Sequence, residues 1–456
     1  MDTITHGIAG ALISKAAFGG RDLVSPGSMN RQRVITWSLM LGAIFPDSDV
    51  VREFFSHNPM LMLTWHRSIT HSLLCLPIWT VILAGLTRVV VKWRKWEAPS
   101  FIALCGIWAI GILSHIFLDV LTTFGTMIWS PLEWSRPAWD VLFIVDFTFT
   151  AIVLIPQLVA WIYEEPKQIK WRALLLWLVF LPAPFLVAKI GKNVGAPISD
   201  ATILAAIVLL TALFLLPVVR GGGLRVGYVN WNRAGLVVAV GYIVAAGYAH
   251  HVAFERVQAF TAEQNLQVET IGALPLPPSL WHWDGLVRAP RGVYEVRMDL
   301  SEGFFQAMKP GAESFEPKVI EHTYYPDALP NQWIQEARQL PEVQKVLWFA
   351  RFPVTRFHKE GDEAVVEFSD LRFPHMQPGR AASFTYRVRF SSNGQSGARQ
   401  NLIFRRDDGG PWGPSHQQRP LAEASGIAKL DPPATFHILR HTYACSLAMK
   451  GVSWAS

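Results

Sequence analysis

The sequence has little charge, since only 17% of its 456 residues are Asp, Glu, Lys or Arg, whereas soluble domains average about 25%. The shortage lies in one part of the chain. Residues 1–250 contain 19 Lys and Arg against 13 Asp and Glu, while residues 251–456 contain 22 of each. The net charge of +6 therefore belongs to the apolar half. This pattern excludes a uniformly soluble enzyme, and it argues against a basic nucleic-acid-binding surface because the polar half is neutral.

Cysteine is also scarce. Cys75 and Cys105 lie in apolar runs and Cys445 lies near the end of the chain, a distribution that fits neither a zinc knuckle nor a disulfide framework. The first residues, Met-Asp-Thr-Ile-Thr-His, lack the basic segment that opens a secretory signal peptide. We therefore expect no cleaved leader.

Long apolar runs predict a mainly α-helical membrane protein. About six runs approach or reach the roughly 20 residues that cross a bilayer. Two earlier apolar stretches are too short to cross comfortably and predict two short N-terminal helices packed on the bundle. The predicted spans are 73–91, 101–119, 141–162, 173–190, 201–219 and 234–250, and the short helices are 7–18 and 34–46.

Basic residues in the loops predict how the helices are oriented. They follow the first, third and fifth predicted spans and also separate the two short helices, so they all fall on one side of the membrane. The positive-inside rule makes this side cytoplasmic, and the sixth span then delivers the chain to the periplasm at about residue 251. The basic residues are Arg21, Arg31, Arg33, Arg88, Lys92, Arg94, Lys95, Lys167, Lys170, Arg172, Arg220, Arg225 and Arg233.

Beyond residue 250 the pattern changes to short alternating runs, such as Tyr294–Leu300, Ala364–Phe368 and Ser383–Phe390. Alternation of this kind predicts half-buried strands. We expect a small strand-rich soluble domain, with an extended linker over the Pro- and Trp-rich segment 270–290. The predicted domains are 1–250, 251–392 and a C-terminal segment, 393–456.

Seven ionisable side chains stand out in the apolar half. Such groups in or beside membrane spans are costly and tend to be functional, and neutral imidazole together with carboxylate suits zinc or a similar divalent ion. His115 and Asp119 are four residues apart and so share one face of a helix, while Pro46 predicts a helix end just before two of the carboxylates. The predicted orientation places all seven at the periplasmic end. They are His6, Asp47, Asp49, His66, His71, His115 and Asp119.

Each of these residues also has a simpler interpretation. A histidine at a helix end is often only an interfacial polar residue, and an aspartate after proline is often a turn or cap residue. Asp146, at the outer end of a predicted span, is a weaker candidate for an eighth ligand or for a partner of a ligand histidine. Arg67 is a candidate to meet an anionic oxygen, such as that of a phosphate.

Four segments resemble the YdjM-like family of bacterial inner-membrane proteins, which are described as metal-dependent hydrolases. The resemblance is close over roughly residues 1–160, and the longer members continue to about residue 390. The segments that carry it are Asp2–Gly7, Pro46–Asp49, His66–Ser72 and His115–Asp119.

The order of the candidate ligands, ending in a His-x-x-x-Asp helix, also resembles that of zinc-dependent phospholipase C and the P1-type nucleases. Those enzymes cleave phosphate esters with a cluster of zinc ions. This second resemblance implies that the ligands are His6, Asp47, His66, His115 and Asp119.

Together these features lead to the hypothesis of a membrane-bound hydrolase that uses a divalent ion, zinc first, to activate water. Asp49 is the predicted proton acceptor, and Arg67 is the predicted stabiliser of developing negative charge. The second resemblance implies a phosphate ester, either small or lipid-linked, as the substrate. A site at the outer edge of the bilayer favours contact with membrane lipid and a lipid or lipid-linked substrate. The alternative is a non-enzymatic membrane protein, a transporter or an ion or proton relay, whose His/Asp cluster carries ions.

The C-terminal segment resembles a different family, the phage integrases (tyrosine recombinases). His437, Arg440 and His441 match the active-site box of that family. The upstream catalytic arginine and the nucleophilic tyrosine are missing, because Tyr443 belongs to the box itself. We interpret residues 393–456 as a truncated integrase fragment with irregular or helical structure, and we expect neither recombinase activity nor a nucleic-acid partner.

Overall fold

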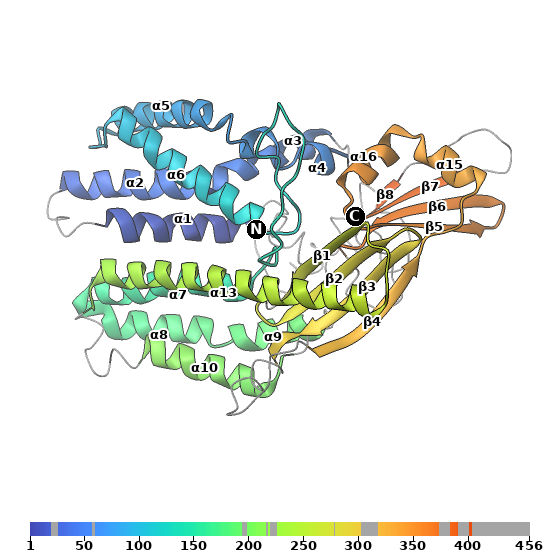
Figure 1. The fold of residues 1–456 in the computed structure, drawn as a ribbon. Helices are drawn as coiled ribbons and strands as arrows, with labels where there is room; N and C mark the ends of the chain where they lie inside the picture. The colour runs from blue at the N-terminus through green and yellow to red at the C-terminus, as the bar shows by residue number, and fades with distance from the viewer. Residues whose placement is uncertain are drawn as a thin grey trace. The chain divides into compact units, whose positions relative to one another are not determined.

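A computed structural model describes residues 1–19, 26–56, 60–193, 198–215, 218, 226–277, 279–301, 318–373, 384–390 and 401–403. The chain divides into two compact units, of which the first is helical and the second is rich in strands (Figure 1). The first unit comprises Met1–Arg52, Trp65–Tyr248 and Pro277–Ser279, and the second comprises Glu53–Thr64, Ala249–Leu276 and Leu280–Ser456.

The first unit is built from apolar helices, and a long irregular segment connects α6 (Phe101–Val120) to α7 (Phe147–Glu164). Asp2 caps the first helix by accepting a hydrogen bond from the Thr5 amide, and Ser100 caps another helix in the same way. The helices are α1 (Thr3–Phe18), α2 (Pro26–Ile44), α5 (Leu76–Arg94), α6 (Phe101–Val120), α7 (Phe147–Glu164), α8 (Ile169–Phe180), α9 (Ala183–Asn193), α10 (Asp200–Phe214) and the first part of α13 (Tyr228–Glu263), and the 3-10 turns are η1 (Phe45–Asp49), η2 (Ile69–His71) and η3 (Pro166–Gln168).

Six helical segments in the described chain are long and apolar enough to cross a membrane, which confirms the predicted class of mainly α membrane protein. These six segments differ from the six predicted spans in two respects. The stretch predicted as a short helix over 34–46 belongs to a longer candidate span, and the predicted span over 201–219 is the 15-residue helix α10. The six segments are Met29–Arg52, Leu76–Arg94, Phe101–Val120, Phe147–Glu164, Ile169–Lys189 and Tyr228–Glu263.

The start of α2 explains the first of these differences. Arg31 and Arg33 were expected in a loop, but they lie in the first turns of α2. Arginine, glutamine and methionine are good helix formers, so a polar segment next to an apolar one can continue the same helix. The basic residues thus mark one end of a helix here rather than a connection between helices.

Helices α1, α2 and α6 pack closely because glycine lies where they meet. A side-chain carbon added at Gly111 of α6 would lie 2.6 Å from the Leu39 carbonyl oxygen and 3.0 Å from the Gly42 Cα atom of α2. One added at Gly10 of α1 would lie 2.8 Å from the Ala43 methyl group. Small residues let helix backbones approach in this way, and the approach brings the polar ends of these helices together.

The described residues of the second unit form two antiparallel four-stranded sheets with strands in sequential order. This confirms the strand-rich region that alternation predicted. The first sheet is β1 (Thr270–Leu276), β2 (His282–Ala289), β3 (Gly292–Asp299) and β4 (Lys318–Pro326); the second is β5 (Pro353–Glu360), β6 (Glu363–Asp370), β7 (Thr385–Phe390) and β8 (Asn401–Ile403). Four helical segments accompany them, namely the end of α3 (Val50–Ser56), α4 (Met60–Thr64), α15 (Gln332–Arg338) and α16 (Pro341–Phe349).

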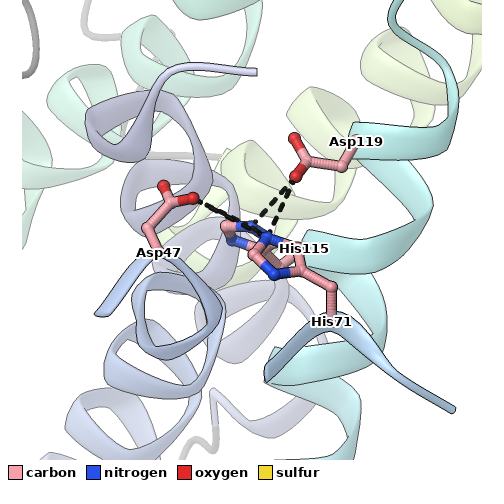
Figure 2. A group of neighbouring side chains, drawn as sticks. All are labelled: Asp47, His71, His115 and Asp119. Carbon is pink, nitrogen blue, oxygen red and sulfur yellow. Dashed lines mark hydrogen bonds and ion pairs between the residues drawn. The ribbon is translucent and has the colours of Figure 1, made fainter. Parts of the chain in front are cut away.

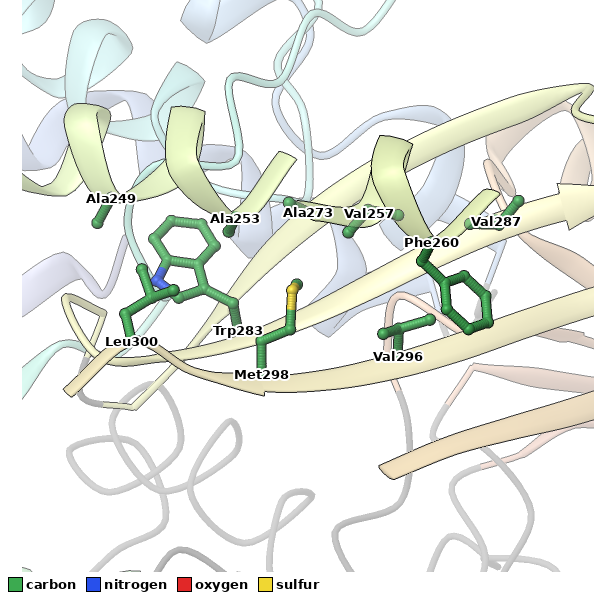
Figure 3. Packing of buried hydrophobic residues seen from close by; sticks show 10 residues of the cluster. All are labelled: Ala249, Ala253, Val257, Phe260, Ala273, Trp283, Val287, Val296, Met298 and Leu300. Carbon is green, nitrogen blue, oxygen red and sulfur yellow. The ribbon is translucent and has the colours of Figure 1, made fainter. Parts of the chain in front are cut away.

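The core of the second unit forms where the last turns of α13 lie on the first sheet (Figure 3). Trp283 of β2 is fully buried there beside Ala253 and Val257 of α13. The predicted linker over 270–290 is therefore wrong, because this segment forms β1 and β2. By sequence alone, the prolines of this segment argue against strands. Pro275 nevertheless lies in β1, which is an edge strand, and an edge strand tolerates the missing backbone amide of proline.

The predicted C-terminal segment, 393–456, lies outside the described residues except for β8. The residues that resemble an integrase, His437, Arg440 and His441, are all outside them. The interpretation of this segment stays a prediction.

Candidate metal centre

Four of the seven predicted ligands converge at one point of the first unit: Asp47, His71, His115 and Asp119 (Figure 2). Each offers one ligand atom, and these atoms all lie within 4.8 Å of one another. Asp47 comes from η1, His71 from η2, and the other two from α6. Segments far apart in the sequence thus supply one compact set of nitrogen and oxygen donors.

The local sequence explains how each ligand is presented. His115 and Asp119 are one helical turn apart on the last turns of α6 and are both fully buried. Pro46 lies at the start of η1, so the α-helix has already ended and Asp47 follows in a tight turn. His71 follows Arg67, whose positive φ of 62° turns the chain sharply before η2.

The distances between the donor atoms are those of a small ion's coordination shell. The Nε2 atoms of His71 and His115 are 3.0 Å apart, and each lies 3.3 Å from Oδ2 of Asp119. Oδ1 of Asp47 lies 3.4 Å from Nε2 of His115 and 3.8 Å from Nε2 of His71. In a tetrahedral zinc site with bonds of about 2.0–2.1 Å, neighbouring donors lie about 3.3 Å apart. The four residues therefore fit a divalent ion.

The hydrogen bonds of the two imidazoles support this assignment. Nδ1 of His115 lies 2.7 Å from the Ala43 carbonyl oxygen and donates its proton there. Nδ1 of His71 lies 3.1 Å from the Thr70 hydroxyl, which donates in turn to Asp49. In the neutral tautomers that carry the proton on Nδ1, the two Nε2 atoms present their lone pairs to each other. Two lone pairs facing each other at 3.0 Å repel unless a cation lies between them.

The two carboxylate oxygens of Asp119 have different partners. Nη2 of Arg67 lies 3.0 Å from Oδ1, and Nε2 of His6 lies 3.1 Å from the same atom. The amino group of Met1 also contacts Oδ1. Oδ2 faces His71 and His115 and finds no hydrogen-bond donor among the described residues, although it is buried. A buried carboxylate oxygen without a donor is costly, and a metal ion would satisfy it.

His6 lies behind the centre rather than in it. Its ring stacks on that of His115, with centroids 3.7 Å apart. Its Nε2 atom interacts with the oxygen of Asp119 that faces away from the four-residue group. His6 thus contacts two of the four converging residues without joining them, and its role as a ligand stays a prediction.

Asp49 and His66 also lie beside the centre. Asp49 accepts hydrogen bonds from Nδ1 of His66 at 2.9 Å, the Arg67 amide at 2.9 Å and the Thr70 hydroxyl at 3.2 Å. These contacts hold the segment that carries His71. Burial disfavours the charged form of His66, but the Asp49 carboxylate outweighs it and raises the pKa of His66 above its ordinary value.

The guanidinium of Arg67 is already engaged within the protein. Its side chain is 2% exposed, and Nη1 donates to the Asp119 carbonyl oxygen and to the Thr122 hydroxyl. In this arrangement it neutralises Asp119, and its predicted action on a substrate oxygen stays a prediction. Thr122 and Thr3, whose hydroxyl donates to Asp47, were not predicted. The one signal for Thr3 was its place in the Asp2–Gly7 segment.

Asp146 has a structural role, which contradicts the prediction of an eighth ligand or a histidine partner. It caps α7, where Oδ1 accepts hydrogen bonds from the amides of Thr148 and Phe149. Oδ2 accepts from the hydroxyls of Tyr242 at 2.7 Å and Ser279 at 2.6 Å. A sequence cannot distinguish such a cap from a ligand, because both place an aspartate at a helix end.

Helix direction separates the candidate centre from the basic residues. His6 lies near the start of α1 and Asp119 near the end of α6, whereas Lys15 lies at the other end of α1. Lys92 and Arg94 lie in the last turn of α5, and His71 precedes the first turn of that helix. The centre therefore lies at the opposite end of the first unit's helices from Lys15, Lys92 and Arg94.

Comparison with known proteins supports the membrane assignment. Residues 1–193 match the family model described as YdjM inner membrane protein, which confirms the resemblance inferred from the four segments. The matched range contains all seven predicted ligands. No curated protein and no solved structure matches the chain. The family match and the six apolar helices together support a multi-pass membrane protein.

Removal of two converging ligands should empty the centre. We expect detergent-purified protein to contain bound zinc or another divalent ion, and the double variant His115→Ala, Asp119→Ala to lose it, as measured by elemental mass spectrometry. The matched control is His251→Ala with Glu255→Ala, because this exposed pair has the same helical spacing and the same 3.3 Å separation. Equal, near-zero metal in the wild type and the ligand variant would contradict the assignment.

Asp49→Asn should weaken the centre without abolishing it. Loss of a carboxylate that orients a ligand histidine costs about 10–100-fold in metal affinity, so we expect a drop of this size in a chelator competition assay. Asp200→Asn, which changes an exposed carboxylate at the start of α10, is the control. An unchanged affinity would show that Asp49 does not position His71.

Proposed function

We propose that the protein is a membrane-bound, metal-dependent hydrolase that acts on phosphate esters of small or lipid-linked molecules. The observation that carries the proposal is the convergence of two imidazole nitrogens and two carboxylate oxygens in a buried site. Mixed imidazole and carboxylate sets suit zinc and related ions.

The four converging residues would hold the ion. When bound, a divalent ion would supply Lewis acidity and lower the pKa of a coordinated water to near 7. Asp47 is the one of the four whose side chain reaches the surface, with 9% exposed against none for the others. Substrate would therefore approach on the side of Asp47.

The pair formed by His66 and Asp49 lies beside the centre, where the ring centroid of His66 is 5.9 Å from that of His71. Asp49 is buried and accepts three hydrogen bonds, whereas the side chain of His66 is 15% exposed. The predicted proton acceptor would then act through its histidine: His66 would exchange the proton, and Asp49 would hold the ring through Nδ1. Arg67 would keep Asp119 ionised and in place, since its guanidinium contacts that carboxylate.

Hydrolysis of a soluble diester tests the activity. We expect metal-loaded protein to cleave bis(p-nitrophenyl) phosphate or a phospholipid, to lose this activity with a chelator and to regain it with zinc. Asp47→Asn should lower kcat by at least about 100-fold, as expected for loss of a group at the reaction centre. The control pair His251→Ala, Glu255→Ala should retain activity. A loaded wild type that cleaves neither substrate would refute the proposal and favour the non-enzymatic alternative.

We also propose that the centre and the strand-rich unit face the periplasm. Lys15, Lys92 and Arg94 lie at the opposite ends of the helices from the centre, and the positive-inside rule places such residues in the cytoplasm. The same rule places the chain beyond α13 on the outer side.

Reporter fusions test this orientation. Alkaline phosphatase joined after Glu255 should be active, and the same enzyme joined after Lys95 should be inactive, because it folds only outside the cytoplasm. A cytoplasmic fluorescent reporter at the two positions is the control and should give the opposite pattern. An inactive phosphatase at Glu255 together with an active one at Lys95 would reverse the proposed topology.

A further inference from the structure

The segment that follows α6 carries large apolar side chains on its surface. Trp129, Leu132, Trp134 and Trp139 are 43%, 83%, 46% and 53% exposed. We call Trp129–Trp139 the tryptophan loop. It lies at the same end of the first unit as the candidate metal centre, because it follows the end of α6 that carries Asp119. Exposed apolar side chains gathered in one loop point to a partner that covers them.

The tryptophan loop continues the apolar outer face of α6. The ring of Trp139 lies 6.2 Å from that of Phe117 in an edge-to-face arrangement. Phe117, Leu113 and Ile110 of α6 are themselves 45%, 40% and 39% exposed. Since α6 is a candidate membrane span, its exposed side chains face lipid. The loop thus extends a lipid-facing surface beyond the end of the helix.

A second group of tryptophans lies beside the other end of α6, at the end of α5 and in the turn that follows it. Trp93, in the last turn of α5, is 74% exposed, and Trp96 follows just before α6 begins. The 20 residues of α6 between the two groups span about 30 Å, which is the thickness of the hydrocarbon core. Tryptophan is enriched at both boundaries of a bilayer. The spacing therefore places the tryptophan loop at the boundary on the side of the metal centre.

Hydrogen bonds connect this loop and the residues just before it to the segment that carries His71. The Met127 amide donates to the Arg67 carbonyl oxygen at 2.9 Å, and the Leu73 amide donates to the Ile128 carbonyl oxygen at 2.9 Å. The Arg136 guanidinium donates to the His66 carbonyl oxygen at 3.1 Å. The depth of the loop in the membrane therefore sets the depth of the metal centre.

We propose that the tryptophan loop is an interfacial anchor that inserts into the boundary between lipid headgroups and acyl chains, and that it holds the metal centre at the level of the headgroup phosphates. The loop contains one acidic and one basic residue, Glu133 and Arg136, so apolar area rather than net charge drives its insertion. The substrate class that follows, a phosphate ester of a membrane lipid reached in the plane of the bilayer, rests on the proposed hydrolase function. The anchor itself does not.

Spin labels test the anchor without any assay of activity. In full-length protein with Cys75, Cys105 and Cys445 replaced by alanine, Leu132→Cys and Leu329→Cys each provide one labelling site. Leu329 of the second unit is 84% exposed and matches Leu132 at 83%. In vesicles of phosphatidylethanolamine and phosphatidylglycerol, oxygen should relax the label at Leu132 more than a water-soluble nickel chelate does, and the label at Leu329 should show the reverse. A label at Leu132 that is as accessible to the chelate as that at Leu329 would overturn the anchor.

Activity then tests the substrate class. The variant Leu132→Ser, Trp134→Ser should lower kcat/KM for a phospholipid in vesicles by at least about tenfold, because a misplaced centre meets the headgroup less often, and should leave cleavage of bis(p-nitrophenyl) phosphate unchanged. The matched control is Leu329→Ser with Trp348→Ser, of similar exposure in the second unit. An equal loss on both substrates, or no loss on either, would overturn the lipid assignment. A wild type that cleaves neither would refute the hydrolase function, while the spin labels would still decide the anchor.

Discussion

The first unit depends on one electrostatic arrangement, the meeting of two imidazole lone pairs and two carboxylate oxygens in a buried space. Nε2 of His71 and Nε2 of His115 are 3.0 Å apart, Nδ1 of His115 donates to the Ala43 carbonyl oxygen, and Nδ1 of His71 lies beside the Thr70 hydroxyl. Such a set is unfavourable by itself, because burial removes the water that would separate the charges and lone pairs. A divalent cation would make the same geometry favourable, and binding of such an ion would then be coupled to the packing of these helices.

Close helix packing makes this arrangement possible. Glycines let α2 approach α1 and α6, and the ends of these helices then bring His6, Asp47 and His115 together. Around the four ligands lies a set of groups that each hold one ligand atom in place. Arg67 occupies one oxygen of Asp119, and Asp49 holds the turn that carries His71. Groups of this kind orient ligands and tune the metal that they bind.

Much of this site could be predicted from residue types and spacing. The helical spacing of His115 and Asp119 places both on one face, and Pro46 indicates the turn that carries Asp47. The division of seven candidates into four converging residues and three neighbours could not be predicted, because it depends on which ring nitrogen donates and to which oxygen. The number of candidate spans, six, was predicted correctly. The prediction missed the polar first turns of α2, and because of Pro275 it assigned the edge strand β1 to a linker. In both cases the contacts of the folded chain outweigh a local preference.

The hydrogen bond from His115 to the Ala43 carbonyl oxygen has a consequence for how this centre can be recognised in related chains. Ala43 is the penultimate residue of α2, and the last carbonyl groups of a helix have no partner within it. His115 therefore caps a helix as well as offering a ligand atom. A chain that no longer used an ion would still have a structural reason to keep this histidine, so its presence alone does not diagnose a working centre. The diagnostic feature is Asp119, since its Oδ2 atom has no donor among the described residues.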